Sequence, residues 1–301
     1  MNHETNPGQP SQRVFIIDET PVDPEIPTAS ATPTGQPKRQ TASNTSRLQS
    51  GTGQRNLTEN ERFQFDLTGY LPLGKLLDPP DLTEARAAIA NPEALPAGVT
   101  VAGNDLELEL RNIVEIHGTL GEIFADRELY SRMLELIWGN QVRLISSRAL
   151  VRHAGFSSRV TQGGRADPRR FGRYRAFLEG EFRCILISVL IALDDTSAGD
   201  GAVGVIPASH KANFAYPYEQ LAEDLPMLRF LPLEAGEALL YTEALSHALT
   251  APRTDDKRWL LYQYGPSYML DWPDCTPTAA VHEQAAADPV RANLLRRPYY
   301  H

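Results

Sequence analysis

His247 and Arg258 are the two residues of this sequence whose types and spacing most directly suggest chemistry. A neutral imidazole nitrogen can bind a transition metal, and a guanidinium on an adjoining strand can donate two parallel hydrogen bonds to a carboxylate. The pair therefore suits a metal site that also binds an acidic co-substrate. The alternative is a hydrogen-bonded histidine and a surface arginine, and the pair taken alone favours that alternative.

Short apolar runs predict the strands that must position these residues. Residues 238–241 and 259–262 are aliphatic and aromatic, and Gly, Pro, Thr and Asp bound them, so we expect two strands joined by a loop. Similar apolar runs recur from Arg143 onward, at 144–145, 185–193, 203–206 and 228–233, and residues 199–201 form a tight turn between two of them. Strands at this spacing predict an antiparallel sandwich of the jelly-roll or cupin kind.

Helices are predicted before and after the strand region. Thr58 and Glu61 have the spacing of a capping box, which begins a first helix. Residues 127–138 place apolar side chains at helical spacing, and Asp288-Pro289 is a typical start of a short final helix. The predicted fold class is therefore mostly β with flanking helices (α+β), in a single domain over residues 57–301.

Residues 1–56 differ in composition from the rest of the chain. They are rich in proline, serine and threonine and show no extended helical or strand period. Such a segment cannot bury enough apolar surface to offset the entropy lost on ordering, so we expect a disordered leader.

Overall composition excludes several classes of protein. The chain of 301 residues has a net charge of -9 and a pI near 5.3, which argues against a nucleic-acid partner. No apolar run approaches the roughly 18 residues of a membrane helix, and the N-terminus lacks the pattern of a secretory signal. We expect an intracellular, cytoplasmic protein whose two cysteines, Cys184 and Cys275, are reduced.

More specific sequence stretches are spread over roughly residues 60–270. They are 65–70 (Phe-Asp-Leu-Thr-Gly-Tyr), 191–195 (Ile-Ala-Leu-Asp-Asp), 199–201, 206–214 and 242–247 (Thr-Glu-Ala-Leu-Ser-His), followed by Arg258 and 262–264. Together they resemble the phytanoyl-CoA dioxygenase family of iron(II)- and 2-oxoglutarate-dependent enzymes. The resemblance implies a double-stranded β-helix with iron(II) and 2-oxoglutarate as cofactors. It also implies that His247 is the distal iron ligand and that Arg258 anchors the far carboxylate of 2-oxoglutarate.

The sequence departs from the family pattern at the other two ligand positions. There the family has a histidine and, two residues on, a carboxylate, and the best alignment places Gln162 and Gly164 at those positions. An amide oxygen is a weak ligand for iron compared with an imidazole, so iron binding is in question. Asp167 is the nearest substitute carboxylate, and His153 is a more distant substitute imidazole.

Two other histidines have simpler interpretations. His210 lies in the segment Ser-His-Lys after an expected strand, and we expect it to make structural hydrogen bonds. His117 lies in an apolar stretch, and we expect it to be part of the core.

Arginines are concentrated between residues 165 and 175, where five arginines accompany a single aspartate. We expect this segment at the mouth of the barrel, where a ring of guanidinium groups would attract an anionic substrate. A solvated loop without a ligand is an equally good interpretation. The candidate entrance residues are Arg165, Arg169, Arg170 and Arg173.

Three functions remain open from the sequence. The first is a 2-oxoglutarate-dependent dioxygenase that oxidises a small organic acid or a specialised metabolite. The second is a metal-independent isomerase or cyclase on the same barrel, in which Gln162 and His247 act on the substrate directly. The third is a non-catalytic binding protein. The resemblance favours the first function, and the two unusual ligand positions favour the others.

Overall fold

The computed structural model describes residues 57–139, 141–156, 160–161, 174–176, 182–212 and 224–299. The expected leader, residues 1–56, lies outside these ranges.

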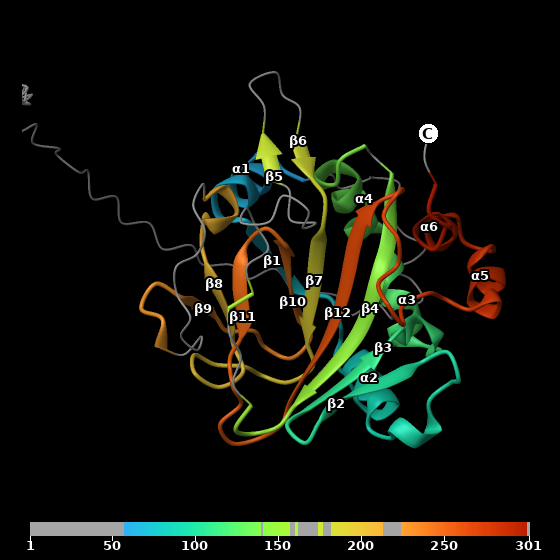
Figure 1. Cartoon of the computed structure of the whole chain (residues 1–301), viewed down its shortest axis with the longest axis horizontal. Coiled ribbons are helices and arrows are strands. Elements are labelled where there is room, and N and C mark those ends of the chain that lie inside the picture. The colour runs from blue at the N-terminus through green and yellow to red at the C-terminus, as the bar shows by residue number, and fades with distance from the viewer. Residues whose placement is uncertain are drawn as a thin grey trace, which may run out of the picture. The chain divides into compact units, whose positions relative to one another are not determined.

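A seven-stranded sheet forms the centre of the described fold, and all of its neighbouring strands are antiparallel (Figure 1). Its order is β1-β10-β7-β12-β4-β3-β2. In chain order the strands are β1 (Tyr70–Lys75), β2 (Thr100–Asn104), β3 (Glu107–Arg111), β4 (Val142–Arg152), β7 (Ile187–Ala192), β10 (Glu237–Thr242) and β12 (Lys257–Pro266).

A second sheet of three strands packs on one face of the first. Its order is β11-β8-β9, and the strands are β8 (Val203–Ile206), β9 (Arg229–Leu231) and β11 (Ser246–Leu249). Val203 and Val205 of β8 share an apolar cluster with Leu190, Leu239 and Trp259 of the large sheet. The two sheets therefore enclose a common interior, and the predicted jelly-roll fold is confirmed. A separate two-stranded ribbon consists of β5 (Tyr174–Ala176) and β6 (Phe182–Cys184).

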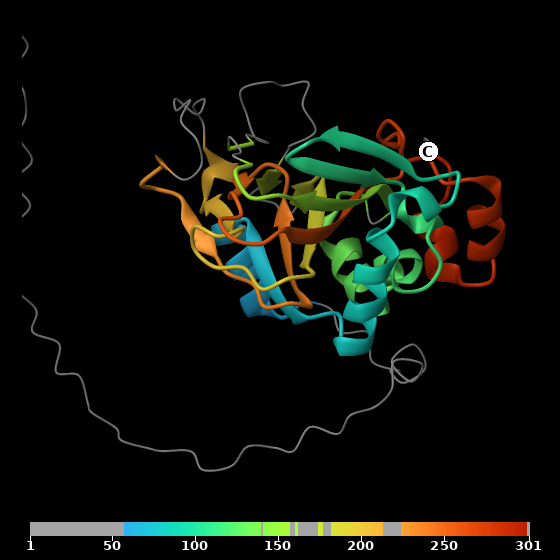
Figure 2. The ribbon, with the colours of Figure 1, turned by 90° about the horizontal axis from the view of Figure 1, so that it is seen from below.

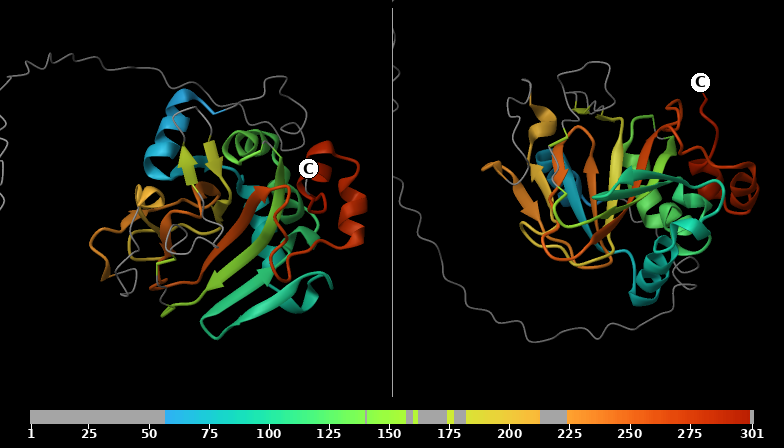
Figure 3. Two further views of the ribbon diagram at one scale, coloured as in Figure 1. Left: turned by 45° about the horizontal axis from the view of Figure 1, so that its top comes forward. Right: turned by 60° about the horizontal axis from the view of Figure 1, so that its bottom comes forward.

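Helices cover the opposite face of the seven-stranded sheet (Figures 2 and 3). The α-helices are α1 (Glu59–Thr68), α2 (Pro79–Ile89), α3 (Thr119–Glu122), α4 (Arg127–Leu136), α5 (Ala279–Ala285) and α6 (Pro289–Leu294). The 3-10 turns are η2 (Pro92–Ala94), η3 (Ile113–Glu115), η4 (Ile123–Ala125) and η5 (Ser209–Lys211). The predicted capping box of Thr58 and Glu61 begins α1, and Asp288 caps α6, so these predicted helix starts are confirmed.

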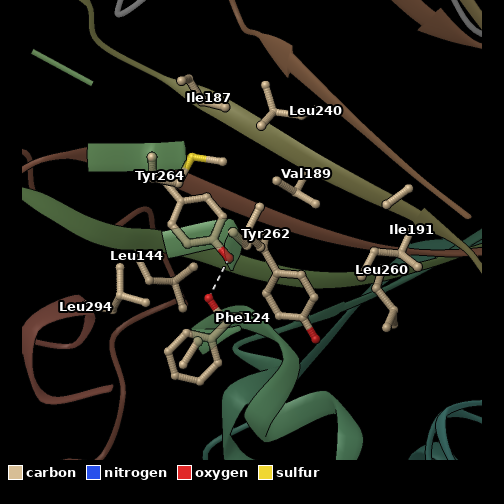
Figure 4. Packing of buried hydrophobic residues seen from close by; sticks show 14 of the residues in the cluster. Phe124, Leu144, Ile187, Val189, Ile191, Leu240, Leu260, Tyr262, Tyr264 and Leu294 are labelled. Carbon is tan, nitrogen blue, oxygen red and sulfur yellow. Dashed lines mark hydrogen bonds between the residues drawn. The ribbon is translucent and has the colours of Figure 1, made fainter. Parts of the chain in front are cut away.

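Strand β12 separates two cores, because its alternate side chains point to opposite faces of the sheet. Trp259 and Leu261 belong to the cluster between the two sheets, which we call the inner core. Leu260, Tyr262 and Tyr264 belong to the cluster shared with the helices, which we call the outer core. Figure 4 shows the outer core, in which the Tyr264 hydroxyl donates a hydrogen bond to the Phe124 carbonyl at 2.8 Å. The parity of each residue in β12 thus decides which core its side chain enters.

The structure corrects one sequence expectation about the site region. The sequence predicts that 238–241 and 259–262 are two strands with only a loop between them. Strand β11 lies in that interval and pairs with β8 in the small sheet, while β10 and β12 are separated by β7 in the large sheet. His247 is therefore a strand residue of the small sheet, and Arg258 is not on a neighbouring strand.

Two further expectations concern cysteines and membranes. Cys184 and Cys275 are both free and buried, and burial raises the pKa of the Cys184 thiol to about 12. Over the described residues, no helix has the length and apolar character needed to cross a bilayer.

Candidate active site

His247 is held on the inner side of β11 with one ring nitrogen engaged. Its Nδ1 lies 2.8 Å from the Leu245 carbonyl oxygen, which can only accept a hydrogen bond, so Nδ1 carries the hydrogen. In the neutral imidazole this leaves Nε2 with a lone pair. The ring lies 4.7 Å from that of Tyr241 in β10, and the His247 side chain is 13% exposed. Orientation by a backbone carbonyl and a bare second nitrogen are what a metal ligand or a general base requires.

Glu243 lies beside His247, in the turn between β10 and β11. Its Oε1 accepts hydrogen bonds from the hydroxyl of Ser188 in β7 and from Nε2 of Gln263 in β12, the latter at 2.9 Å. Its Oε2 lies 3.9 Å from Nε2 of His247, and the Glu243 side chain is also 13% exposed. The sequence interpretation did not select Glu243, because nothing in the local pattern shows that two distant strands hold its carboxylate toward His247.

A chain of polar contacts continues from Glu243 along the inner face of the large sheet. Gln263 Nε2 also donates to the Ser188 hydroxyl at 3.1 Å, and its Oε1 accepts from Nη2 of Arg148 in β4 at 2.7 Å. Arg148 Nη1 donates to Glu109 Oε1 at 3.0 Å. Gln263 and Ser188 are almost completely buried, so these bonds satisfy polar groups that water cannot reach.

The hydroxyl of Tyr241 lies among these charged groups. Burial raises its pKa well above the usual range, and the charge of Glu243 adds to this effect. Tyr241 therefore keeps its proton at neutral pH and remains a hydrogen-bond donor beside His247.

Two basic side chains face the inner core near β11. Arg152 at the end of β4 donates from Nη1 to the Leu249 carbonyl at 3.1 Å and from Nε to Glu107 Oε2 at 3.0 Å. It therefore links the large sheet to the strand that carries His247. Lys257, opposite Arg152 in the register of β12 and β4, lies 3.3 Å from the Asp200 carboxylate.

Arg258 faces the outer side of the sheet, which corrects the expectation that it binds an acid beside His247. It has the parity of Leu260 and Tyr262, and it pairs in register with Val151, all three of which belong to the outer core. Its guanidinium donates two hydrogen bonds to the Asp194 carboxylate, at 2.8 and 2.7 Å. These hydrogen bonds raise the pKa of Arg258. The physical reason is strand parity, because a residue next to Trp259 points away from the inner core.

The other candidate residues divide into those outside the described ranges and those with structural roles. Outside the described ranges lie Gln162, Gly164 and Asp167, as well as the entrance candidates Arg165, Arg169, Arg170 and Arg173. Thr161, the residue before Gln162, forms an antiparallel bridge with His247 through hydrogen bonds of 2.7 and 3.1 Å. Among the residues that the structure does describe, no three His, Cys, Asp or Glu side chains gather closely enough to hold a metal ion.

The structure also shows the surroundings of three further histidines. His210 is buried and its Nε2 contacts the Asp66 carbonyl at 3.0 Å, so the expected structural hydrogen bond is confirmed, although the partner is at the end of α1. His153 pairs with Asp256 at 2.9 Å and is 40% exposed. His117 is exposed, so the expectation that it belongs to the core is wrong.

The fold and the inward-facing histidine define a double-stranded β-helix with a polar site between its sheets. The model of the phytanoyl-CoA dioxygenase family matches residues 65–259. The chain belongs to this family, which consists of 2-oxoglutarate-dependent oxygenases. None of the curated proteins matches the chain in sequence.

Three solved structures illustrate the proteins with which this chain shares its fold. HygX from Streptomyces hygroscopicus, solved with nickel, 2-oxoglutarate and hygromycin B bound, has a TM-score of 0.62 at 23% identity, over 75% of this chain and 94% of HygX. The 2-oxoglutarate-dependent epimerase SnoN from nogalamycin biosynthesis has a TM-score of 0.53 at 15% identity, over 74% of this chain and 87% of SnoN. The 2-oxoglutarate-dependent carbocyclase SnoK, also from nogalamycin biosynthesis, has a TM-score of 0.51 at 17% identity, over 72% of this chain and 89% of SnoK. At these identities the likeness supports the fold.

Proposed function

We propose that this protein is a non-haem, 2-oxoglutarate-dependent oxidoreductase that acts on a small organic acid or specialised metabolite in the space between its sheets. The observation that carries the proposal is His247, whose Nδ1 is fixed by Leu245 and whose Nε2 lies 3.9 Å from Oε2 of Glu243. Family membership and the nickel, 2-oxoglutarate and hygromycin B bound by HygX support the same class of reaction.

His247 fits a bound iron(II) ion, because its side chain is only 13% exposed, its Nδ1 is anchored on a backbone carbonyl and its Nε2 makes no hydrogen bond to the described residues. Iron(II) with 2-oxoglutarate would supply the oxidation of an unactivated C–H bond. The protein's own residues would orient the reactants and exclude water. Tyr241 presents a protonated hydroxyl beside the His247 ring, and the apolar side chains of the inner core surround both.

Arg152 is the residue that we assign to the carboxylate of the co-substrate. Its guanidinium faces the inner core and reaches Leu249, two residues beyond His247 on the same strand. Burial lowers the pKa of Arg152, while the charge of Glu107 acts in the opposite direction. Its Nη2 makes no hydrogen bond within the described part of the chain, so that nitrogen is available for an acid. Lys257 gives a second positive charge on the same face.

The substrate is proposed to be anionic. The support is the arginine-rich segment of residues 165–175, whose charge contrasts with the net charge of -9 of the whole chain. Electrostatic attraction of this kind depends on ionic strength, so substrate KM is expected to rise with salt.

Anaerobic reconstitution with iron(II), followed by measurement of 2-oxoglutarate conversion to succinate, tests the proposal. The wild-type protein is expected to form succinate with iron(II), and His247→Ala is expected to lose both the bound iron and the turnover. Turnover by the His247→Ala protein equal to that of the wild type would refute the assignment of His247.

A metal-independent isomerase or cyclase is the second candidate function. It is favoured by the continuous hydrogen-bonded chain from Glu109 through Arg148, Gln263 and Ser188 to Glu243, which can hold and polarise a substrate without a metal. This candidate predicts that substrate conversion continues under anaerobic conditions in the presence of a chelator. Loss of conversion on chelation would exclude it.

A further inference from the structure

We propose that Glu243 is the carboxylate ligand of the metal site and binds the same ion as His247. The inference rests on the proposed function, in which His247 is a metal ligand. It replaces the family's carboxylate position, where this sequence has Gly164, with a residue from the turn immediately before β11.

Each of the two side chains has one polar atom that is fixed by a hydrogen bond and one that makes no hydrogen bond to the described residues. The Nδ1 hydrogen of His247 is donated to Leu245, and Oε1 of Glu243 accepts from Ser188 and Gln263. Metal ligands in proteins are commonly oriented in this way, through hydrogen bonds made by the atom that does not bind the metal. The two remaining atoms, Nε2 and Oε2, are the ones that lie nearest to each other.

The distance between Nε2 of His247 and Oε2 of Glu243 is short enough for one ion to reach both atoms. At 3.9 Å, Nε2 and Oε2 are too far apart for a direct hydrogen bond. Bonds from a first-row metal to such atoms are about 2.0–2.2 Å long, so one ion between His247 and Glu243 can reach both. Two ligand atoms that bind one ion at right angles, with bonds of this length, are about 3 Å apart, so metal binding would draw Nε2 and Oε2 closer together by about 1 Å.

The charge of Glu243 leads to the same conclusion. Its Oε1 partners, Ser188 and Gln263, are neutral, and its ion-pair contact within the described residues is the 3.9 Å one to His247. A carboxylate that is only 13% exposed is stabilised when a cation lies against its free oxygen.

Chain geometry makes the pair compact. Glu243 and His247 are four residues apart, and the turn between β10 and β11 brings both side chains to the inner face. The Glu243 backbone N–H is bonded to the Leu186 carbonyl, and the His247 backbone is bonded to Thr161. Both ligands are thus attached to the sheets, which limits their movement before a metal binds.

Anaerobic titration with cobalt(II) as the probe metal tests the inference independently of turnover. Binding is followed by calorimetry and by the visible absorption of the bound ion. Wild type is expected to bind one ion per chain, Glu243→Gln to bind at least ten-fold more weakly with a changed spectrum, and Glu243→Asp to fall between them. Glu135→Gln removes a carboxylate from α4 outside the barrel and is the matched control, with unchanged binding. Gly164→Asp in the Glu243→Gln background is expected to restore affinity.

The outcomes separate this inference from the proposed function. If Glu243→Gln binds cobalt(II) as tightly as wild type, Glu243 is not a ligand, although the proposed oxidoreductase function stands. Loss of binding on Asp167→Asn in the same experiment would identify Asp167 as the carboxylate instead. If wild type binds no cobalt(II), both the inference and the metal dependence of the proposed function are refuted. Should Glu243→Gln fail to fold, wild-type affinity in Glu243→Asp and in Glu243→Ala would overturn the inference.

Discussion

Replacing Arg258 with lysine should lower the stability of the fold and leave the affinity for 2-oxoglutarate unchanged. Arg258 is bound to Asp194 by two hydrogen bonds of 2.8 and 2.7 Å, and the two side chains are 30% and 16% exposed. Lysine keeps the positive charge but cannot donate the two parallel hydrogen bonds of the guanidinium. Arg86 lies 3.4 Å from the same carboxylate, so Asp194 keeps a positively charged neighbour in the variant.

The expected loss is about 1–2 kcal/mol, because hydrogen bonds to charged groups contribute roughly 1.5–3 kcal/mol when buried and less when partly exposed. For a domain of this size that corresponds to a decrease in Tm of about 3–6 °C. Arg62→Lys is the matched control. Arg62 pairs with Glu135 but is 55% exposed, so its replacement should change stability by less than about 0.5 kcal/mol.

The assay combines thermal unfolding with calorimetric titration of 2-oxoglutarate into metal-loaded protein. Arg152→Lys is expected to show the opposite pattern to Arg258→Lys, with at least ten-fold weaker 2-oxoglutarate binding, because Arg152 faces the inner core. If Arg258→Lys lowers 2-oxoglutarate affinity ten-fold while Tm is unchanged, the assignment of the two faces of β12 is wrong.

Three other measurements examine separate parts of the structure. Tyr264→Phe removes the buried hydrogen bond to the Phe124 carbonyl and is expected to cost about 1–3 kcal/mol in urea unfolding; an unchanged midpoint would show that the carbonyl finds another donor. Burial alone would raise the pKa of Asp66, but hydrogen bonds, among them one from Lys211, outweigh it and hold that pKa below its usual value. Because the pKa of Asp66 is lower in the folded than in the unfolded protein, ionised Asp66 stabilises the fold above the unfolded pKa, and this stabilisation is lost as pH falls through the folded pKa. Asp66→Asn should therefore weaken the decrease in the free energy of unfolding at acid pH, measured by urea unfolding across a pH series. Cys184, whose pKa burial raises to about 12, should resist alkylation at pH 8 in the folded protein and react on unfolding; rapid labelling of the native state would contradict its burial.

The elements that the sequence predicted correctly are those whose signals are local. The capping box at Thr58 begins a helix because its two hydrogen bonds form within four residues. The run 203–206 is bounded by turn residues and coincides with β8. The hairpin of β2 and β3 was not predicted, because its half-exposed residues, TVAGN and ELELR, include few apolar side chains.

The candidate site was less predictable, since it depends on which face each residue of β12 presents. That strand is buried on both sides, so the alternation of apolar and polar residues that normally reveals a face is absent. The neighbours Lys257 and Arg258 look equivalent in sequence, yet they enter different cores. Glu243 was missed for a related reason, because its partners Ser188 and Gln263 come from strands that are distant in the chain.

The two-sided burial of β12 also bears on how new activities can arise on this scaffold. Tyr262 and Tyr264 attach the strand to α3 and η4 through hydrogen bonds to the Leu120 and Phe124 carbonyls, on the side away from the site. Substitutions at inward positions such as Leu261 can therefore reshape the space between the sheets while those outer attachments hold the backbone in place. A mutant library restricted to the inward-facing residues of β12 should contain more folded variants than a library of equal size that also includes the outward-facing residues. The same partition would let natural relatives diverge in substrate while their overall architecture stays constant.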